Sequence, residues 1–239
     1  MNKSKIINLA LLTGRSGSSF KDKNIRKVGG KPLLYYPCEA ANKSKIFSYK
    51  YCSSDSKKIL TEAEKNGFIP IKRPKKLASS TAKHEDVIIH ALEYLSLKGI
   101  VPDIITVLMS NCATITSNQI KIANKKIIED NKITAVTPII KNQDHHPFRA
   151  RKLIGGKVTS YFPDNNNISS NRDELTENFY FTHSFWMLRL KNGKVQKSSK
   201  ATPWEFMGKN ISPLIVDYSI DIHDIHDLEI TERYIENKK

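Results

Sequence analysis

The chain has 239 residues, and its 39 Lys and Arg residues outnumber its 24 Asp and Glu residues, which gives a formal net charge of +15. A hydrophobic content of 39% is enough for one sizeable core, so we expect a single domain over residues 1–239. The sequence has no membrane-length apolar run, no secretory signal pattern and no paired cysteines, which excludes a membrane-spanning protein and predicts a cytoplasmic one without disulfides.

Strands and helices alternate over the first 140 residues. Short apolar runs predict strands at residues 6–12, 49–53, 68–71, 104–109 and 133–139. Apolar residues at helical spacing predict helices at residues 32–42, 56–66 and 81–97. A fourth helix is predicted by the apolar positions from Ile120 to Ile128, capped at its start by Thr116 or Ser117. This alternation is typical of an α/β fold with a mainly parallel sheet and helices on both faces, in which ligands bind beyond the carboxyl ends of the strands.

The second part of the chain is less regular. Residues 164–171 are rich in turn formers, and residues 179–190 predict one long aromatic strand. The remaining predicted elements are a short strand at 214–216, an acidic turn at 221–227 and a helix ending near Glu236. We interpret residues 141–213 as an elaboration of the same domain.

A cationic turn containing glycine follows the first predicted strand. Residues 14–24 read Gly-Arg-Ser-Gly-Ser-Ser-Phe-Lys-Asp-Lys-Asn, which is neither a Walker loop nor a dinucleotide fingerprint. Glycine lets backbone N–H groups converge on an anion, and Arg15, Lys21 and Lys23 add charged donors. The turn therefore suits a phosphate group, although a surface loop of any lysine-rich protein has a similar composition.

Several short motifs follow one another in a fixed order. The first combines residues 11–18 with Lys-Asn-Ile at 23–25 and Gly-Lys-Pro-Leu-Leu at 30–34. The later ones are Ser-Ser-Asp at 53–55, the segment 72–81, Asp-His-His-Pro at 144–147, Arg172 and the segment 219–228. In this order they resemble the motifs of the acylneuraminate cytidylyltransferases, which make CMP-activated nonulosonic or related 2-keto sugar acids.

The resemblance implies a Rossmann-like nucleotidyltransferase fold of the GT-A-like type, a three-layer αβα sandwich. It implies transfer of CMP from CTP to a sugar acid of the sialic, legionaminic, pseudaminic or Kdo type, with release of pyrophosphate, Mg²⁺ as cofactor and a homodimer. In such an enzyme of carbohydrate biosynthesis, the region 141–213 would serve sugar binding and dimerisation.

On this resemblance each candidate site residue has an expected role. The expected nucleotide-binding residues are Gly14, Arg15, Ser16, Gly17, Asn24, Arg73 and His84. The expected sugar-binding residues are Asn111, His146, Arg149 and Arg172, and the expected catalytic residues are Arg15, Lys21 and Asp221. Asp221 and His223 are the expected metal ligands.

Four departures from the family pattern affect these roles. Ser19 stands where the family's loop lysine is usual, so Lys21 would supply that charge. The family's glutamine and arginine are absent from residues 109–115, which leaves Asn111 as the nearest polar candidate for the sugar. His84 stands where a ribose-contacting serine is common, and His223 replaces the second acid of an Asp-x-Asp pair.

These residue types suit nucleotidyl transfer, in which a protein mainly holds an in-line geometry and offsets charge. Arg15 would offset phosphate charge, and a divalent ion at Asp221 would lower the pKa of the attacking hydroxyl. Imidazole is a poor Mg²⁺ ligand, so water, Asp224 or a preference for Mn²⁺ are alternatives at His223. The sugar carboxylate suits the fork of Arg172 or Arg149, while His146 is a loop residue either near the sugar pocket or simply at the surface.

Two alternatives stay open. The same fold could act on a different nucleotide or sugar, as the altered segment 109–115 suggests. A non-catalytic protein that binds nucleotides or nucleic acid is the other alternative, suggested by the charge and by His223. We expect no nucleic-acid partner, because the lysine clusters are not interleaved with aromatic residues that could stack on bases.

Overall fold

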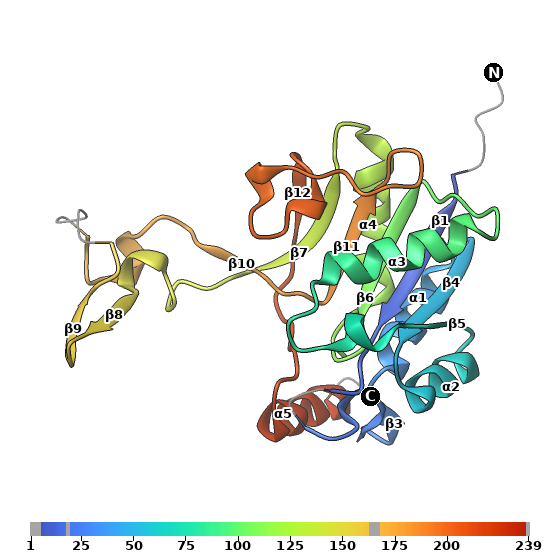
Figure 1. Ribbon diagram of the computed structural model, residues 1–239. Coiled ribbons are helices and arrows are strands. Elements are labelled where there is room, and N and C mark those ends of the chain that lie inside the picture. Colours follow the sequence, from blue (N-terminus) through green and yellow to red (C-terminus); the bar gives the residue numbers. More distant parts are fainter. Residues whose placement is uncertain (1–5, 18–19, 163–167, 238–239) are drawn as a thin grey trace.

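A central sheet runs through the computed structural model, which describes residues 6–17, 20–162 and 168–237 (Figure 1). Within these residues the sheet has eight strands in the order β10-β7-β11-β6-β1-β4-β5, with β12 paired to β7. The strands are β1 (Asn8–Thr13), β4 (Tyr49–Ser54), β5 (Ile69–Lys72), β6 (Ile104–Met109), β7 (Ala135–Lys141), β10 (Phe179–Phe181), β11 (Phe185–Arg189) and β12 (Ile211–Ile215).

Most strand pairs are parallel. Strand β1 pairs in parallel with β4 and β6, and β4 pairs in parallel with β5. Strand β11 lies antiparallel between β6 and β7. The carboxyl ends of β1, β4, β5 and β6 therefore meet at one edge of the sheet, and the loops that follow them gather there.

Helices cover both faces of the sheet. They are α1 (Tyr35–Ser44), α2 (Lys57–Lys65), α3 (His84–Ser96), α4 (Ser117–Glu129) and α5 (Ile225–Glu236). Alternate side chains of β1 point to opposite sides: Ala10 and Leu12 pack with α1, α2 and α4, whereas Leu9 and Leu11 pack with α3 and the segment 201–207. The predicted three-layer αβα sandwich with a mainly parallel sheet is thus confirmed.

Side-chain caps explain where several helices begin. Thr116 accepts a hydrogen bond from Gln119 N while the Gln119 side chain accepts one from Thr116 N, so Thr116 caps α4. Ser56 caps α2 in the simpler way, with its side chain accepting from Ile59 N. Asp224 and Asp227 form a second reciprocal cap at α5.

Two sequence-based interpretations differ from the structure in more than a shifted boundary. Pro32 lies in the small pair β2 (Lys27–Val28) and β3 (Lys31–Pro32), and the first helix begins only at Tyr35. The predicted long strand at 179–190 is two strands, β10 and β11, because the chain turns at His183 with a positive φ of 53°. The turn is needed because β10 pairs with the distal part of β7 (139–141), whereas β11 inserts between β6 and β7.

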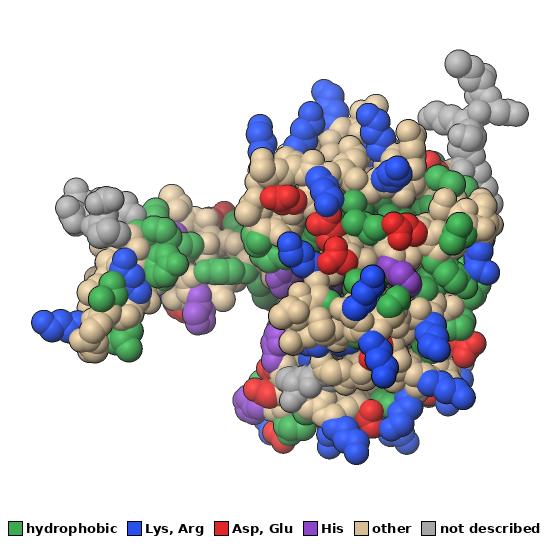
Figure 2. Space-filling view, viewed as in Figure 1, with side chains coloured by type: hydrophobic (Ala, Val, Ile, Leu, Met, Phe, Trp, Pro, Cys, Tyr) green, Lys and Arg blue, Asp and Glu red, His purple; other side chains and the backbone are tan. Residues whose placement is uncertain are grey.

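Residues 142–162 and 168–178 leave the sheet as an arm that projects from the body (Figures 1 and 2). The arm carries the hairpin of β8 (Arg151–Ile154) and β9 (Lys157–Ser160). Its apolar side chains are strongly exposed, with Leu153 at 72% and Val158 at 71%. The turn-rich stretch predicted at 164–171 falls partly outside the described residues, as does Ser19. No helix of the described residues is long and apolar enough to cross a membrane.

Candidate active site

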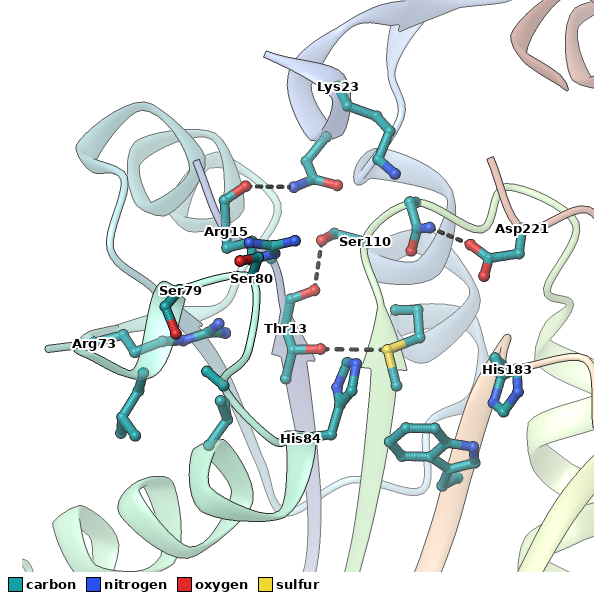
Figure 3. A pocket seen from close by; sticks show the side chains of 18 of the residues that line it. Thr13, Arg15, Lys23, Arg73, Ser79, Ser80, His84, Ser110, His183 and Asp221 are labelled. Atoms are coloured by element: carbon teal, nitrogen blue, oxygen red, sulfur yellow. Dashed lines mark hydrogen bonds between the residues drawn. The ribbon is translucent and has the colours of Figure 1, made fainter. Parts of the chain in front are cut away.

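A cavity of about 550 Å³ lies at the carboxyl ends of β1, β5 and β6 (Figure 3). The turn after β1 contributes Gly14 and Arg15, and the C-terminal segment after β12 contributes Asp221 and His223. The cavity is also lined by Lys23, Asn24, Arg73, Ser79, Ser80, His84, Ser110, Asn111, His183, Trp186 and Trp204. Segments about 200 residues apart in the sequence thus share one cavity.

The turn at Gly14 is held against the loop after β6. A Cβ atom on Gly14 would lie 2.4 Å from Ser110 Oγ, so this close approach requires glycine. Ser110 Oγ donates a hydrogen bond to Thr13 O at 2.5 Å, and Asn24 Nδ2 donates to Arg15 O at 3.1 Å. The backbone of the turn is therefore fixed from both sides before any ligand binds.

Arg15 is the cation of this turn that reaches into the cavity. Its Nη1 donates to Ala78 O at 3.3 Å, which joins the turn to the segment after β5. Ser16, next in the chain, donates from its N to Asp55 Oδ1 at 2.9 Å and from its Oγ to Asp55 Oδ2. Ser16 and Gly17 adjoin the cavity but do not line it, so Ser16 supports the turn from outside.

Lys23, rather than the predicted Lys21, lines the cavity. Lys21 is exposed and lies outside it, whereas Lys23 is buried and its Nζ donates to Ile222 O at 2.7 Å. Burial lowers the pKa of Lys23, the Asp221 carboxylate raises it, and the Arg15 cation lowers it. Asp22 adopts a left-handed conformation, after which the short helix Lys23–Ile25 turns Lys23 and Asn24 inward, and the distant Ile222 carbonyl then accepts from Lys23.

Arg73 presents a second fixed cation. Only 6% of this residue is exposed, and its Nε and Nη2 donate to Ser53 Oγ at 3.1 Å and to Ser53 O at 2.6 Å. Burial lowers the pKa of Arg73 to about 10, so the guanidinium stays charged at neutral pH. An anion in the cavity would meet this charge with little loss of side-chain freedom.

His84 begins α3 and faces the cavity, where it remains open to solvent. Its ring lies edge-on to Trp186 with a centroid distance of 5.1 Å. Desolvation of the imidazole by the surrounding protein, and to a smaller extent the charges of Arg73, His183 and Arg15, lower the pKa of His84 to about 4. The imidazole is therefore neutral at pH 7 and can both donate and accept a hydrogen bond.

Asp221 is the acid of the cavity. Its Oδ1 accepts a hydrogen bond from Asn111 Nδ2, and its Oδ2 lies 3.2 Å from His223 Nε2. Burial raises the pKa of Asp221, and His223, Lys23, His183 and the Asn111 hydrogen bond lower it. Asn111 thus lines the cavity, and its amide holds the acid.

The residues at Asp221 fit a hard divalent cation. Within the described part of the chain no group of three or more His, Cys, Asp or Glu side chains could hold a metal alone. Mg²⁺ is commonly bound by one or two carboxylates, with waters and substrate phosphates completing its shell. The half-buried carboxylate of Asp221 lies in a cavity whose cations Arg15, Lys23 and Arg73 suit an anion, so a metal held by Asp221 would take the rest of its shell from waters and substrate phosphates.

Three predicted sugar-binding residues do not lie in this cavity. Arg172 is exposed on the arm and pairs with Asp144, Nη1 to Oδ1 at 2.6 Å. Arg149 is exposed in the same arm, and the His146 ring accepts from Phe148 N at 3.3 Å. Strand β7 carries these residues away from the sheet, so one chain does not bring them to its own cavity.

Sequence reasoning also missed residues that the fold brings in. Trp204 lines the cavity from the position before the 3-10 helix Glu205–Met207, and His183 lines it from the break between β10 and β11. Ser79 and Ser80 line it from the segment after β5. The sequence did contain a signal that Lys23 belongs to the site, because Lys23 directly precedes Asn24 in the motif. For His183 the signal was a polar residue inside an aromatic run.

Comparison with known proteins gives a consistent result. The cytidylyltransferase family model matches residues 9–229. The pseudaminic acid cytidylyltransferase of Campylobacter jejuni subsp. jejuni serotype O:2 is 27% identical over 183 residues, which cover 75% of this chain and 77% of that protein. The N-acylneuraminate cytidylyltransferase of Escherichia coli O18:K1:H7 is 37% identical over 85 residues, or 35% of this chain and 20% of that protein.

Solved structures agree in fold. CMP:2-keto-3-deoxy-manno-octonic acid synthetase complexed with CTP superposes with a TM-score of 0.69 at 13% identity, covering 98% of this chain and all of that one. The 4-diphosphocytidyl-2C-methyl-D-erythritol synthase from Anaerococcus prevotii gives a TM-score of 0.63 at 14% identity, covering 97% and 99%. At such low identity these similarities establish the fold alone.

Proposed function

The chain belongs to the cytidylyltransferase family, and we propose that it transfers CMP from CTP to a nonulosonic or related 2-keto sugar acid, with release of pyrophosphate. Its relatives in sequence include cytidylyltransferases named for pseudaminic acid and N-acylneuraminate. The observation that carries the proposal is the shared cavity, which joins the cationic turn after β1 to Asp221.

The nucleotide is assigned to the side of the cavity formed by the turn after β1 and the segment after β5. Arg15, Arg73, Ser79 and Ser80 lie together there in Figure 3, and Lys23 faces the same space from above. A triphosphate carries several negative charges, and fixed cations together with backbone N–H groups are the donors that bind it. His84 is close to Arg73 and offers a neutral hydrogen-bonding group for the nucleoside.

The sugar acid is assigned to the opposite side, where Asn111, His183 and Asp221 lie. In the proposed reaction a sugar hydroxyl attacks the α-phosphorus of CTP and releases its proton to water, and the bond from that phosphorus to the bridging oxygen breaks as pyrophosphate leaves. Arg15 and Lys23 would hold the triphosphate in line and offset the charge that develops on the leaving pyrophosphate.

Asp221 and His223 are the residues that would hold Mg²⁺, or Mn²⁺ as the alternative. When bound there, the ion would lower the pKa of the attacking hydroxyl and offset charge on the α-phosphate. Asn111 fixes the orientation of the carboxylate through Oδ1, which leaves Oδ2 directed toward His223. Lys23 holds the same segment through the Ile222 carbonyl.

A homodimer is the second part of the proposal. Among the described residues, Leu153, Ile154 and Val158 of the hairpin of β8 and β9 are strongly exposed, and exposed patches of this kind are typical of interaction sites. We propose that the arm packs on a second copy and that Arg149 or Arg172 of one copy meets the sugar carboxylate in the other. The cytoplasmic location and the lack of a nucleic-acid partner stay predictions.

Pyrophosphate release tests the function directly. Purified protein is incubated with CTP, Mg²⁺ and a panel of sialic, legionaminic, pseudaminic and Kdo-type acids. We expect release with at least one nonulosonic acid, and no release with any member would contradict the proposal. Light scattering of the same preparation gives the mass, for which we expect twice that of the chain.

A second candidate keeps the reaction type and changes the substrate. It is favoured by the segment after β6, where Met109 and Asn111 line the cavity and the amide of Asn111 is engaged by Asp221. Thermal stabilisation by CTP, UTP, GTP and ATP separates the two candidates. Thermal stabilisation by CTP alone would exclude the other nucleotides as the substrate. Stronger stabilisation by UTP, GTP or ATP would exclude CTP as the preferred substrate.

A further inference from the structure

His183 has a backbone conformation that is uncommon for a residue other than glycine. Among the described residues four non-glycine positions have a positive φ: Asp22, Lys45, His183 and Asn192. Asp22 and Lys45 flank helices, and Asn192 precedes Gly193 in a tight turn, which are ordinary places for the left-handed conformation. His183 alone among the four lines the cavity.

The neighbours of His183 hold this conformation in place. Thr182 N donates to Pro138 O at 3.0 Å, and Ser184 O accepts from Met109 N at 3.2 Å. The side chains of Thr182 and Ser184 hydrogen-bond to each other at 3.1 Å. The backbone is thus fixed on both sides of His183, which is the condition under which a strained residue persists.

The ring of His183 is enclosed by aromatic side chains. The centroids of Trp204, Trp186 and Phe181 lie 5.1, 5.8 and 6.3 Å from its own. Within the part of the chain that the structure describes, neither ring nitrogen has a hydrogen-bond partner. These contacts orient the imidazole and leave its donor and acceptor for a group inside the cavity.

From this geometry we infer that His183 determines acceptor binding by hydrogen-bonding a hydroxyl of the sugar acid. The inference rests on the proposed function, which assigns this side of the cavity to the sugar. A hydroxyl fits better than the sugar carboxylate, because the Asp221 carboxylate lies on the same side and would repel a second anion. The strained backbone is kept because it directs the ring into the cavity.

Two substitutions separate this role from a purely structural one. His183→Gly removes the ring and relieves the left-handed strain, whereas His183→Phe keeps aromatic packing and removes the hydrogen bond. Lys45→Gly is the matched control, because Lys45 has a φ of 56° and lies outside the cavity. Initial rates at varied acceptor and varied CTP are measured together with thermal unfolding.

We expect the acceptor KM to rise about five- to tenfold in both His183 variants, the loss typical of one hydrogen bond between neutral groups. The CTP KM should stay within twofold of wild type, and His183→Gly should unfold no earlier than wild type, as should Lys45→Gly. An unchanged acceptor KM in either variant, or an equal rise in the CTP KM, would overturn the role of His183. Wild-type protein that turns over no sugar acid would instead contradict the proposed function, and the role of His183 with it.

Discussion

The sharpest test of a single cavity residue compares Lys23, which lines the cavity, with Lys21, which lies outside it. Lys23→Met removes a cation that faces the proposed triphosphate and the hydrogen bond to Ile222 O at 2.7 Å. Removing one preorganised donor to developing charge typically lowers turnover by about 10²- to 10³-fold. We expect kcat/KM for CTP to fall by at least about 10²-fold.

The same substitution should leave the fold nearly intact. A hydrogen bond from a charged donor contributes about 1.5–3 kcal/mol, but burying the ammonium also costs free energy, as its lowered pKa indicates. Methionine keeps the apolar stem, and the Ile222 carbonyl still has the Asn111 amide at 3.4 Å. The opposing effects predict a change in the free energy of unfolding within about 1 kcal/mol, measured by urea denaturation.

Lys21→Met is the matched control for Lys23→Met, because the residue type is identical, the position is two residues away and the side chain is exposed outside the cavity. We expect its rate of pyrophosphate release to stay within about threefold of wild type. Equal losses in the two variants, or a larger loss for Lys21→Met, would refute the assignment of the loop charge to Lys23.

Further predictions concern the other cavity residues. Arg15→Ala and Asp221→Ala should each abolish pyrophosphate release while the circular dichroism spectrum is retained; a near-normal rate in either would refute its role. His223→Asp should raise affinity for Mg²⁺, measured as a lower half-saturating concentration in the rate assay, whereas unchanged Mg²⁺ dependence would show that residue 223 is no ligand. His84 has a folded pKa of about 4 against an ordinary 6.5, so the unfolded chain binds more protons between these values, and stability should rise with pH across that window. His84→Asn should reduce this rise in urea denaturation, and identical pH profiles would contradict the assignment.

The central sheet was predictable because its strands are buried and continuous. Residues 104–109 are apolar apart from Thr106 and form β6 with the predicted bounds, and the turn after residue 13 marked the carboxyl end of β1. Parallel strands bring such ends to one edge, so the sequence alone could place Arg15 near Arg73. Local caps such as Thr116 were also readable, since their signals lie within four residues.

The second half was harder because its structure depends on distant partners. Nothing local shows that β11 inserts between β6 and β7, and this insertion is what breaks the aromatic run at His183. The arm looked like part of the site because its motif residues are similar to the family's. A single sequence cannot show that Arg172 pairs with Asp144 outside the cavity of its own chain.

Lys23 shows a different limit. The loop contains Arg15, Lys21 and Lys23, and composition cannot tell that Lys23 rather than Lys21 joins Arg15 in lining the cavity. The choice depends on the left-handed turn at Asp22 and on the carbonyl of Ile222, almost 200 residues away.

A double-mutant cycle on CTP binding tests most directly whether the turn after β1 and the C-terminal acid act on one ligand. Calorimetric titrations with Mg²⁺ are made for wild type, Arg15→Lys, Asp221→Asn and the double variant. Two residues that grip one metal-bound triphosphate should be coupled, so we expect the losses to depart from additivity by more than about 0.5 kcal/mol. Strictly additive losses would mean that the two residues act independently, which would contradict a joint nucleotide and metal site.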